Sequence, residues 1–339
     1  MIKYTEDAKA SEQFKRNYRD GLDAIISARQ EELAKKRAEY AADIFTDGDR
    51  YREDLKKMLG WPLVGHEKGG IAPVRSTLLS KEEGHTIYRM EFEVLEGLFL
   101  TGLYFEADGE GKKPLVLVQH GGRGTPELVS GIIGNTYNYN DMLKRVIARG
   151  VHAFAPQLLL WEVEKFGISH NRANVDARLK RVGGSITAVE IFGLQRILDY
   201  FETRENISEF GMVGLSYGGF YALFTAAIDK RLKSTISCSF FNTRDKYPWN
   251  DWTWFGAAER FDDAEIAALV YPRKLCLQIG LSDELFDAEY GKKSYERLLE
   301  MSKSVGDEWV KLVPFEGKHE FCKDNAHIDA LVGHLKEEI

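Results

Sequence analysis

Residues 212–219 read Met-Val-Gly-Leu-Ser-Tyr-Gly-Gly, and this stretch decides the fold. Its first four residues form a short apolar run, which is typical of a strand buried on both faces. The segment from Tyr217 to Ile228 is predicted to be a helix. Glycines on both sides of Ser216 allow the tight turn that joins such a strand to a helix. The stretch therefore predicts a serine hydroxyl held at a helix N-terminus, directly after a buried strand.

The alternation of strand and helix continues on both sides of Ser216. Further buried strands are predicted at 115–118, 151–155, 235–239, 275–279 and 309–313, and helices at 141–149, 187–201, 262–269, 288–302 and 326–339. An antiparallel meander of strands at 76–79, 86–95 and 99–105 precedes them. We expect an α/β fold with a mostly parallel, doubly wound sheet and antiparallel N-terminal strands. Its binding crevice lies outside the carboxyl ends of the parallel strands.

The first sixty residues are predicted to form a helical N-terminal extension. Apolar residues recur every three or four positions across 12–44, with Gly21 as a candidate interruption. A second helix is expected over 49–60, with Pro62 as a stop signal. The extension could be a dimer contact, a wall over the binding crevice, or a segment that simply packs on the main domain. The expected divisions are the extension (1–62), the main α/β domain (63–339) and, inside it, an aromatic-rich insertion (241–261).

Composition excludes several classes of protein. With 44% hydrophobic and 29% charged residues, the 339-residue chain can bury a large core. Its 53 acidic and 46 basic side chains give a net charge of −7 without a basic stripe, so nucleic acid is not an expected partner. Three widely spaced cysteines show no metal-ligand spacing and favour a reducing compartment. Without an apolar leader or a long apolar run, we expect a cytoplasmic protein that makes no membrane contact.

A serine hydroxyl becomes a nucleophile only when a base takes its proton and a third group orients that base. Among the eight histidines, His319 follows the last predicted strand and precedes the last helix. The base occupies this place when the chain order is serine, acid, histidine. The other histidines weighed for the role were His66 and His85, which precede the main sheet, and His327 and His334, which fall on the final helix. His319 is therefore the predicted base.

The acid is expected in the loop after the strand at 275–279. That loop reads Gly-Leu-Ser-Asp-Glu-Leu-Phe-Asp over 280–287. Asp283 is the first carboxylate that a short loop would present, with Glu284 and Asp287 as rivals. The sequence thus predicts Ser216, Asp283 and His319 as one catalytic set.

A second glycine-rich loop, Gln-His-Gly-Gly-Arg-Gly at 119–124, follows the strand at 115–118. Glycines let backbone N–H groups approach a developing oxyanion closely, so Gly121 and Gly122 are candidate donors together with Tyr217 N–H. Arg123 and His120 are either substrate contacts or supports of the loop. Neither a Walker pattern nor a complete Gly-x-Gly-x-x-Gly is present to suggest phosphate binding.

The insertion at 241–261 is dense in aromatic residues. Trp249, Trp252 and Trp254 could form flat walls of a substrate pocket, because rigid rings bury area with little loss of entropy. Packing in the core is the alternative interpretation of the same residues.

In the order of these parts the chain resembles the α/β-hydrolase superfamily, within its dienelactone hydrolase and acetyl xylan esterase-like branch. The resemblance covers about residue 50 to the C-terminus. Beyond the serine turn it rests on the motifs Leu-Gly-Trp-Pro-Leu (59–63), Gly-Arg-Gly (122–124), Ala-Ala-Ile-Asp-Lys-Arg-Leu-Lys (226–233), Gly-Leu-Ser-Asp (280–283) and Gly-Lys-His-Glu (317–320). It implies a serine hydrolase that cleaves carboxylic esters, often acetyl groups on carbohydrates, without a metal or organic cofactor.

The sequence therefore predicts acyl transfer by Ser216 to a small-molecule ester substrate, with the acyl-enzyme released by water. Cleavage of a peptide, amide or C–C bond by the same three residues is one alternative. A catalytically silent binding protein of the same fold is another. The oligomeric state stays open, with a homo-oligomer among the options.

Overall fold

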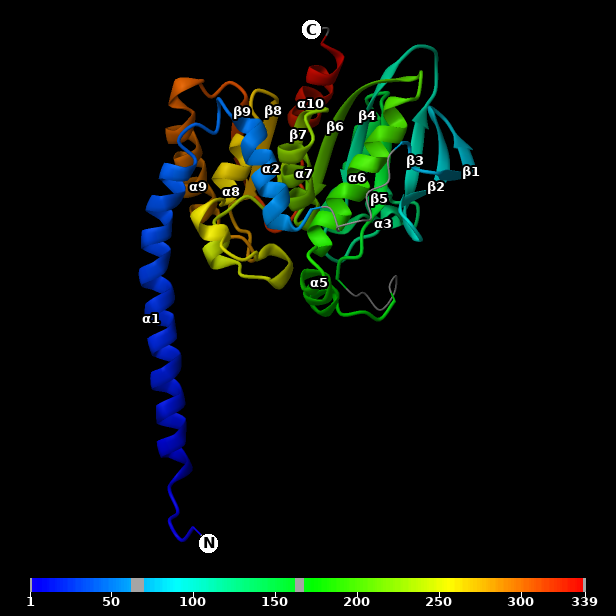
Figure 1. Ribbon diagram of the computed structural model, residues 1–339. Helices are drawn as coiled ribbons and strands as arrows, with labels where there is room; N and C mark the ends of the chain where they lie inside the picture. Colours follow the sequence, from blue (N-terminus) through cyan, green and yellow to red (C-terminus); the bar gives the residue numbers. More distant parts are fainter. Residues whose placement is uncertain (1, 62–69, 162–167, 338–339) are drawn as a thin grey trace.

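A computed structural model describes residues 2–61, 70–161 and 168–337. Its centre is a nine-stranded sheet with helices on both faces, as Figure 1 shows. The strands are β1 (Val74–Glu82), β2 (His85–Leu95), β3 (Leu98–Ala107), β4 (Lys113–Gln119), β5 (His152–Gln157), β6 (Ile207–Leu215), β7 (Leu232–Cys238), β8 (Lys274–Gly280) and β9 (Val310–Phe315). Their spatial order is β1-β2-β3-β5-β4-β6-β7-β8-β9.

The sheet combines an antiparallel and a parallel part. The strands β1, β2 and β3 form an antiparallel meander, and β3 pairs antiparallel with β5. From β5 through β4 to β9 every pairing is parallel. This mixed architecture confirms the predicted sheet, because each strand lies within two or three residues of a predicted run or extends it.

The helices fill the connections between the strands. They are α1 (Ala8–Tyr40), α2 (Gly48–Leu59), α3 (Pro126–Ser130), α4 (Met142–Ile147), α5 (Arg172–Arg181), α6 (Ile186–Glu202), α7 (Tyr217–Ile228), α8 (Asp263–Ala268), α9 (Ala288–Met301) and α10 (Ala326–Lys336), with short 3₁₀ turns η1 (Tyr137–Tyr139), η2 (Arg244–Lys246), η3 (Asn250–Trp252), η4 (Ala257–Glu259) and η5 (Ser302–Ser304). The sequence did not predict α3 and α5, which are short and lack a clear apolar period. The expected interruption at Gly21 is absent, since α1 runs through it.

The second helix of the extension, α2, packs in the hydrophobic core of the main domain. Tyr51, Leu55 and Leu59 of α2 are buried in the same cluster as the helices and strands of the main sheet. Arg52 joins them by donating to the carbonyl oxygens of Ala227 at 3.0 Å and Leu269 at 2.6 Å. The expected stop at Pro62, the motif residue Leu63, the boundary between 62 and 63, and His66 lie outside the described residues.

The position of β4 sets the binding crevice. Its neighbours are β5 on one side and β6 on the other, so the connections that leave the carboxyl ends of β4 and β6 run in opposite directions. Such a switch point leaves a crevice outside the strand ends. The two glycine-rich stretches singled out in the sequence both lie there.

Candidate active site

Ser216 occupies a sharp turn between β6 and α7. Its φ of 61° and ψ of −120° place it in a region that non-glycine residues rarely adopt. Its N–H donates to the carbonyl oxygen of Cys238 at 2.8 Å, and its carbonyl accepts the N–H of Phe220 at 2.9 Å. Bonds on both sides therefore hold the backbone in this strained conformation.

The glycines around Ser216 are required by close backbone contacts. A Cβ on Gly214 would lie 2.1 Å from the carbonyl oxygen of Gly218. A Cβ on Gly218 would lie 2.2 Å from the carbonyl oxygen of Gln119, at the end of β4. Any side chain at either place would push β4, β6 and α7 apart. The Gly-x-Ser-x-Gly pattern is thus a packing requirement as well as a turn signal.

His319 and Asp283 are brought together from the loops after β9 and β8. The Nδ1 atom of His319 lies 2.9 Å from Oδ2 of Asp283, whose side chain is 1% exposed. The other carboxylate oxygen accepts the N–H groups of Leu285 at 2.8 Å and Phe286 at 3.1 Å. These bonds fix the carboxylate so that Nδ1 carries the proton and Nε2 is left as the basic nitrogen.

The two rival acids have other partners. Glu284 pairs with Lys318 at 3.2 Å, and both side chains are largely exposed. Asp287 accepts the N–H of Glu289 at 2.9 Å and caps helix α9.

Ser216 and His319 line the same pocket, whose volume is about 470 Å³. The pocket lies at the carboxyl ends of β4 and β6. Its other lining residues are Gly121, Gly122, Arg123, Leu128, Tyr137, Asn138, Tyr139, Trp161, Leu215 and Leu285.

The candidate oxyanion donors differ in their bonding. Tyr217 is the first residue of α7, where a backbone N–H has no acceptor within the helix. Gly121 N–H already donates to the hydroxyl of Tyr139 at 2.8 Å, so it is engaged in this structure. Gly122 accepts the N–H of Trp161 through its carbonyl at 2.8 Å, which fixes the peptide without using its own N–H. Of the two predicted loop glycines, Gly122 therefore stays the candidate donor.

Comparison with known proteins finds a relative that matches about half of the chain. No protein-family model matches the chain. A protein of Bacillus subtilis (strain 168) named "Putative hydrolase YtaP" is 28% identical over 200 residues, which cover 53% of this chain and 64% of that protein. The alignment thus spans less than two thirds of the relative.

Solved structures match a larger part of the chain. The methylesterase BT1017 superimposes with a TM-score of 0.65 at 19% identity, covering 91% of this chain and 67% of that one. A glucuronoyl esterase from Solibacter usitatus gives 0.64 at 12% identity, with 88% and 94% covered. Acetyl xylan esterase 1 from Thermoanaerobacterium sp. JW/SL YS485 gives 0.56 at 14% identity, with 86% and 94% covered. This chain has the α/β-hydrolase fold.

Two polar residues of the glycine-rich loop at 119–124 have different roles in this α/β-hydrolase fold. His120 is fully buried, with Nδ1 2.9 Å from the carbonyl oxygen of Gly121, and Nε2 accepts the N–H of Leu158 at 3.2 Å. Burial lowers its pKa to about 4, so the ring is neutral and supports the loop. Arg123, in contrast, is exposed at the pocket and remains a candidate substrate contact.

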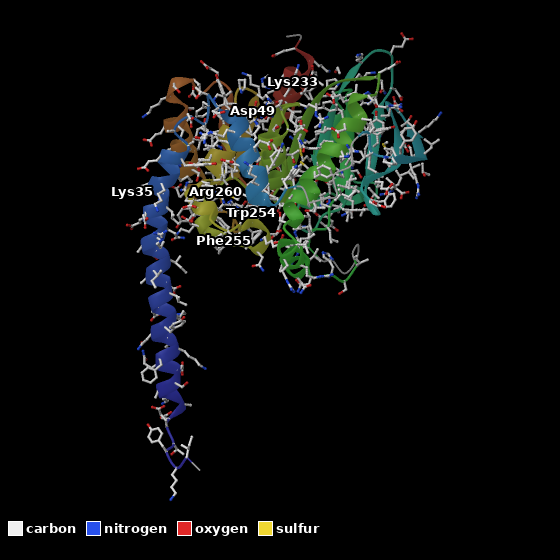
Figure 2. All side chains as sticks on the ribbon, viewed as in Figure 1. Lys35, Asp49, Lys233, Trp254, Phe255 and Arg260 are labelled. Atoms are coloured by element: carbon white, nitrogen blue, oxygen red, sulfur yellow. The ribbon has the colours of Figure 1, made fainter. Side chains whose placement is uncertain are left out.

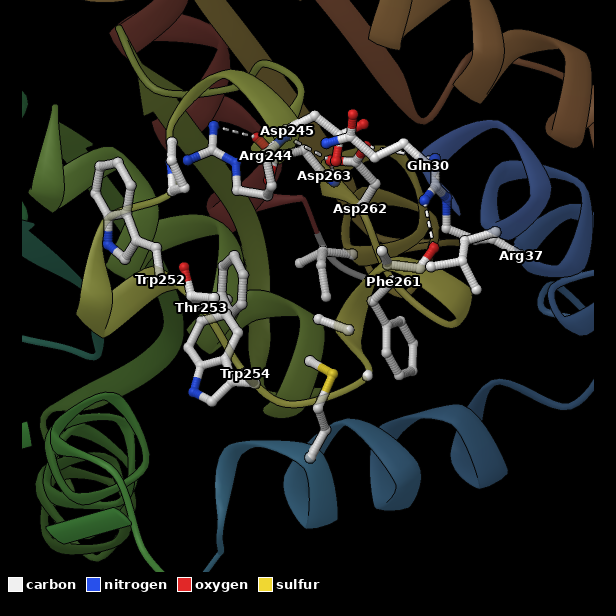
Figure 3. Close-up of a pocket in the computed structure, with 18 residues that line it drawn as sticks. Gln30, Arg37, Arg244, Asp245, Trp252, Thr253, Trp254, Phe261, Asp262 and Asp263 are labelled. Carbon is white, nitrogen blue, oxygen red and sulfur yellow. Dashed lines mark hydrogen bonds and ion pairs between the residues drawn. The ribbon is translucent and has the colours of Figure 1, made fainter. Parts of the chain in front are cut away.

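The aromatic insertion does not line the pocket in the way that the sequence predicted. Trp252 and Trp254 surround a separate pocket of about 290 Å³, together with Phe261 and Arg37 of the extension, as Figure 3 shows. Both indoles are buried, at 3% and 8% exposure. This corrects the substrate-wall interpretation for these two residues in favour of core packing.

Trp249 also lies behind the pocket lining. Its ring stacks on Trp252 with centroids 4.4 Å apart and lies 5.8 Å from the ring of Tyr217. The ring that reaches the pocket from this stack is Trp161, at 5.3 Å from Trp249. Trp161 follows β5 in the sequence, and its place after a buried strand was the only signal that could have identified it.

A buried ionic cluster supports the back of the site. Arg172 of α5 bonds to Glu190 of α6 at 2.9 Å and to Asp251 at 2.6 Å. The Tyr217 hydroxyl donates a hydrogen bond to Asp251 at 3.0 Å. The oxygen of the same Tyr217 hydroxyl accepts a hydrogen bond from the indole N–H of Trp161 at 3.2 Å. Burial and the Asp251 carboxylate raise the pKa of Tyr217, so its hydroxyl keeps its proton. The cluster therefore connects the helix after Ser216 with the tryptophan that holds Gly122.

Metal ligands do not gather within the described part of the chain. Among residues 2–61, 70–161 and 168–337, no three His, Cys, Asp or Glu side chains are grouped so that they could hold a metal ion. Within the same ranges, no helix is long and apolar enough to cross a membrane.

Burial raises the pKa of Cys276 to about 12, so this thiol is protonated at neutral pH.

Proposed function

We propose that this protein hydrolyses carboxylic esters, with Ser216 as nucleophile, His319 as general base and Asp283 as the group that orients it. The observation that carries the proposal is the bond from His319 to the buried Asp283, on an imidazole that shares one pocket with Ser216. The esterases among the structural matches support the same chemistry.

The reaction follows from the atoms at the pocket. His319 Nε2 takes the proton of the Ser216 hydroxyl as its oxygen attacks the ester carbonyl. Negative charge develops on the carbonyl oxygen, and the N–H groups of Tyr217 and Gly122 stabilise it. The imidazolium then gives its proton to the leaving alcohol. Water attacks the acyl-enzyme in a second, equivalent step and frees the serine.

The substrate class proposed here is an ester on a carbohydrate, in particular an acetyl ester. Two of the matched structures are named as a glucuronoyl esterase and an acetyl xylan esterase, and a third as a methylesterase. The pocket supplies aromatic rings, at Tyr137 and Trp161, beside the polar groups of Asn138 and Arg123. Such a mixture suits a polar ring with apolar faces.

The first prediction concerns the nucleophile. Ser216→Ala should reduce turnover of p-nitrophenyl acetate by at least about a thousandfold and abolish labelling by a fluorophosphonate, because the attacking oxygen is removed. Ser282→Ala is the matched control: it removes an exposed hydroxyl one residue from Asp283 and should leave both readouts intact. Circular dichroism would verify that both variants are folded.

Three outcomes distinguish the proposal from its alternatives. Retained turnover in Ser216→Ala would refute the assignment of the nucleophile. Labelling of the unmodified protein without hydrolysis of any ester in an acetylated-sugar panel would favour an amide, peptide or C–C substrate. Absence of labelling in the unmodified, folded protein would favour a catalytically silent binding protein.

A further inference from the structure

Most of helix α1 makes no contact with the rest of the described molecule. Every residue from 11 to 29 is exposed, and burial begins only at Gln30. Arg37, near the end of the helix, is its one buried side chain among the described residues of the helix and bonds to the carbonyl oxygen of Ala258 at 2.6 Å. Figure 1 shows α1 leaving the body, and Figure 2 shows the N-terminal part of the helix standing clear of other elements.

The free part of α1 carries an apolar stripe. Phe14, Tyr18, Leu22, Ile25 and Ile26 are 67%, 72%, 43%, 62% and 53% exposed. Their spacing of three and four residues places all five on one face of the helix, within an arc of about 120°. Contiguous apolar side chains of this size are unfavourable in water and mark interaction surfaces.

Helical propensity alone does not stabilise this segment. Isolated helices of fewer than about 15 residues are marginal in water, and longer ones depend on packing of an apolar face. Gly21, in the middle of the free part, costs about 1 kcal/mol relative to alanine. A packing partner on the stripe would supply the missing stabilisation.

Charge along α1 indicates what that partner is. Residues 8–19 hold four basic side chains and one acidic one, a net charge of +3. Residues 20–32 hold four acidic side chains and one basic one, a net charge of −3. The helix is therefore complementary to itself when two copies run in opposite directions, whereas parallel copies would place like charges together.

We propose that α1 is a dimerisation element in which two copies of the chain pair their α1 helices antiparallel, crossing near Gly21. In this arrangement Phe14 faces Ile26 of the second copy, and Tyr18 faces Leu22. The basic segment 8–19 of each helix lies beside the acidic segment 20–32 of the other. Gly21 allows a close approach at the crossing, and the two bodies lie at opposite ends of the helix pair.

A membrane surface is the less favoured occupant. An amphipathic helix that binds anionic lipid carries an excess of basic residues. Residues 8–32 have a net charge of zero, since the two halves cancel. The proposal concerns assembly and does not depend on the reaction assigned to Ser216.

The first test compares two substitutions of equal charge on adjacent residues. Ile25→Glu places a carboxylate in the stripe, whereas Ala24→Glu places one on a different face of the same turn. In sedimentation equilibrium at micromolar concentration, the unmodified chain and Ala24→Glu should have twice the 38.6 kDa mass of one chain. Ile25→Glu should weaken the dimer at least tenfold and sediment as a monomer.

The second test measures helix direction by disulfide crosslinking. A mixture of Phe14→Cys and Ile26→Cys chains should crosslink, because antiparallel pairing brings these positions face to face. Phe14→Cys alone should not, since its two copies are about 18 Å apart along the axis. The chain with only its native cysteines is the control.

Opposite results would overturn the proposal. A monomeric unmodified chain, or a dimer that Ile25→Glu does not affect, would exclude α1 as the contact. Faster crosslinking of Phe14→Cys with itself would exclude the antiparallel direction. Binding of a monomer to phosphatidylserine vesicles, lost in Ile25→Glu, would assign the stripe to a membrane surface instead.

Discussion

At the scale of single residues, one buried histidine shows how a loop at the candidate site is held by an uncharged support. His120 uses both ring nitrogens in bonds to backbone groups, and it has no contact with water. A charged ring would lose the bond from Leu158 N–H, because both nitrogens would then be donors. The loop that carries Gly122 therefore depends on a neutral His120.

This dependence predicts a loss of stability in acid. The pKa of His120 is about 4 in the folded chain against 6.5 when exposed, so the unfolded chain binds the extra proton between these values. The free energy of unfolding should be fully retained above pH 6.5 and should fall as the pH drops toward 4. Relative to neutral pH, protonation of His120 in the unfolded chain should lower the free energy of unfolding by about 2 kcal/mol at pH 5.

Urea unfolding at pH 7.5 and pH 5 measures this effect. His120→Asn keeps a donor near the Gly121 carbonyl but cannot titrate. Its difference in stability between the two pH values should be smaller than that of the unmodified chain by about 2 kcal/mol. Equal differences would show that His120 is not the responsible group.

At the scale of elements, the buried cluster of Arg172, Glu190 and Asp251 fixes how α5, α6, α7 and the insertion meet. Its effect on the site passes through Tyr217, whose hydroxyl bonds both Asp251 and Trp161. Tyr217 is thus a positioning residue through its side chain and a candidate oxyanion donor through its backbone.

The two tyrosines of α7 allow a matched test of this role. Tyr217→Phe frees the indole of Trp161 and should lower kcat about tenfold, which corresponds to about 1.4 kcal/mol, with KM changed less than twofold. Tyr221 lies one turn further and bonds Arg172 and Glu190 without contacting Trp161. Tyr221→Phe should lower stability but leave kcat within twofold. Equal losses of kcat would indicate a general structural effect.

At the scale of the whole molecule, α2 is the part of the extension that anchors it. Arg52 donates to the carbonyl oxygens of Ala227 and Leu269, which lie at the carboxyl ends of α7 and α8. Helix ends expose carbonyl groups that need donors, and a cation there also interacts favourably with the helix dipole. One arginine therefore connects the extension, the helix after Ser216 and helix α8.

Removing this anchor should be costly. Arg52→Ala removes the side-chain donor to the carbonyl of Ala227, whereas the carbonyl of Leu269 keeps a bond from Arg273 at 3.0 Å. It should lower the free energy of unfolding by about 2 kcal/mol. Arg50→Ala, two residues away, removes an arginine whose side chain is 43% exposed and pairs with Asp43 and Asp47. It should cost less than about 1 kcal/mol. Thermal and urea unfolding of the two variants would measure the difference.

The sequence by itself determined the features that are local or that follow from chain order. Short apolar runs alternating with helical periods specified a mostly parallel sheet. Steric limits at Gly214 and Gly218 specified the turn at Ser216. The loops that follow β8 and β9 must leave the same edge of a parallel sheet, so the sequence could place Asp283 near His319. Their catalytic roles stay predictions until Ser216→Ala is measured.

Only the tertiary structure decided which side chains face the pocket. Trp252 and Trp254 are the aromatic residues expected in a substrate wall, yet their rings pack against Phe220 and Phe224 of α7. Trp161 lines the pocket instead. The hydroxyl of Tyr139 accepts the hydrogen bond of Gly121 N–H. The sequence of the glycine-rich loop does not indicate this bond. Periodicity specifies which face of an element is apolar, but not which distant element covers that face. For the same reason, only the tertiary structure shows that no other element covers the apolar stripe on the described part of α1.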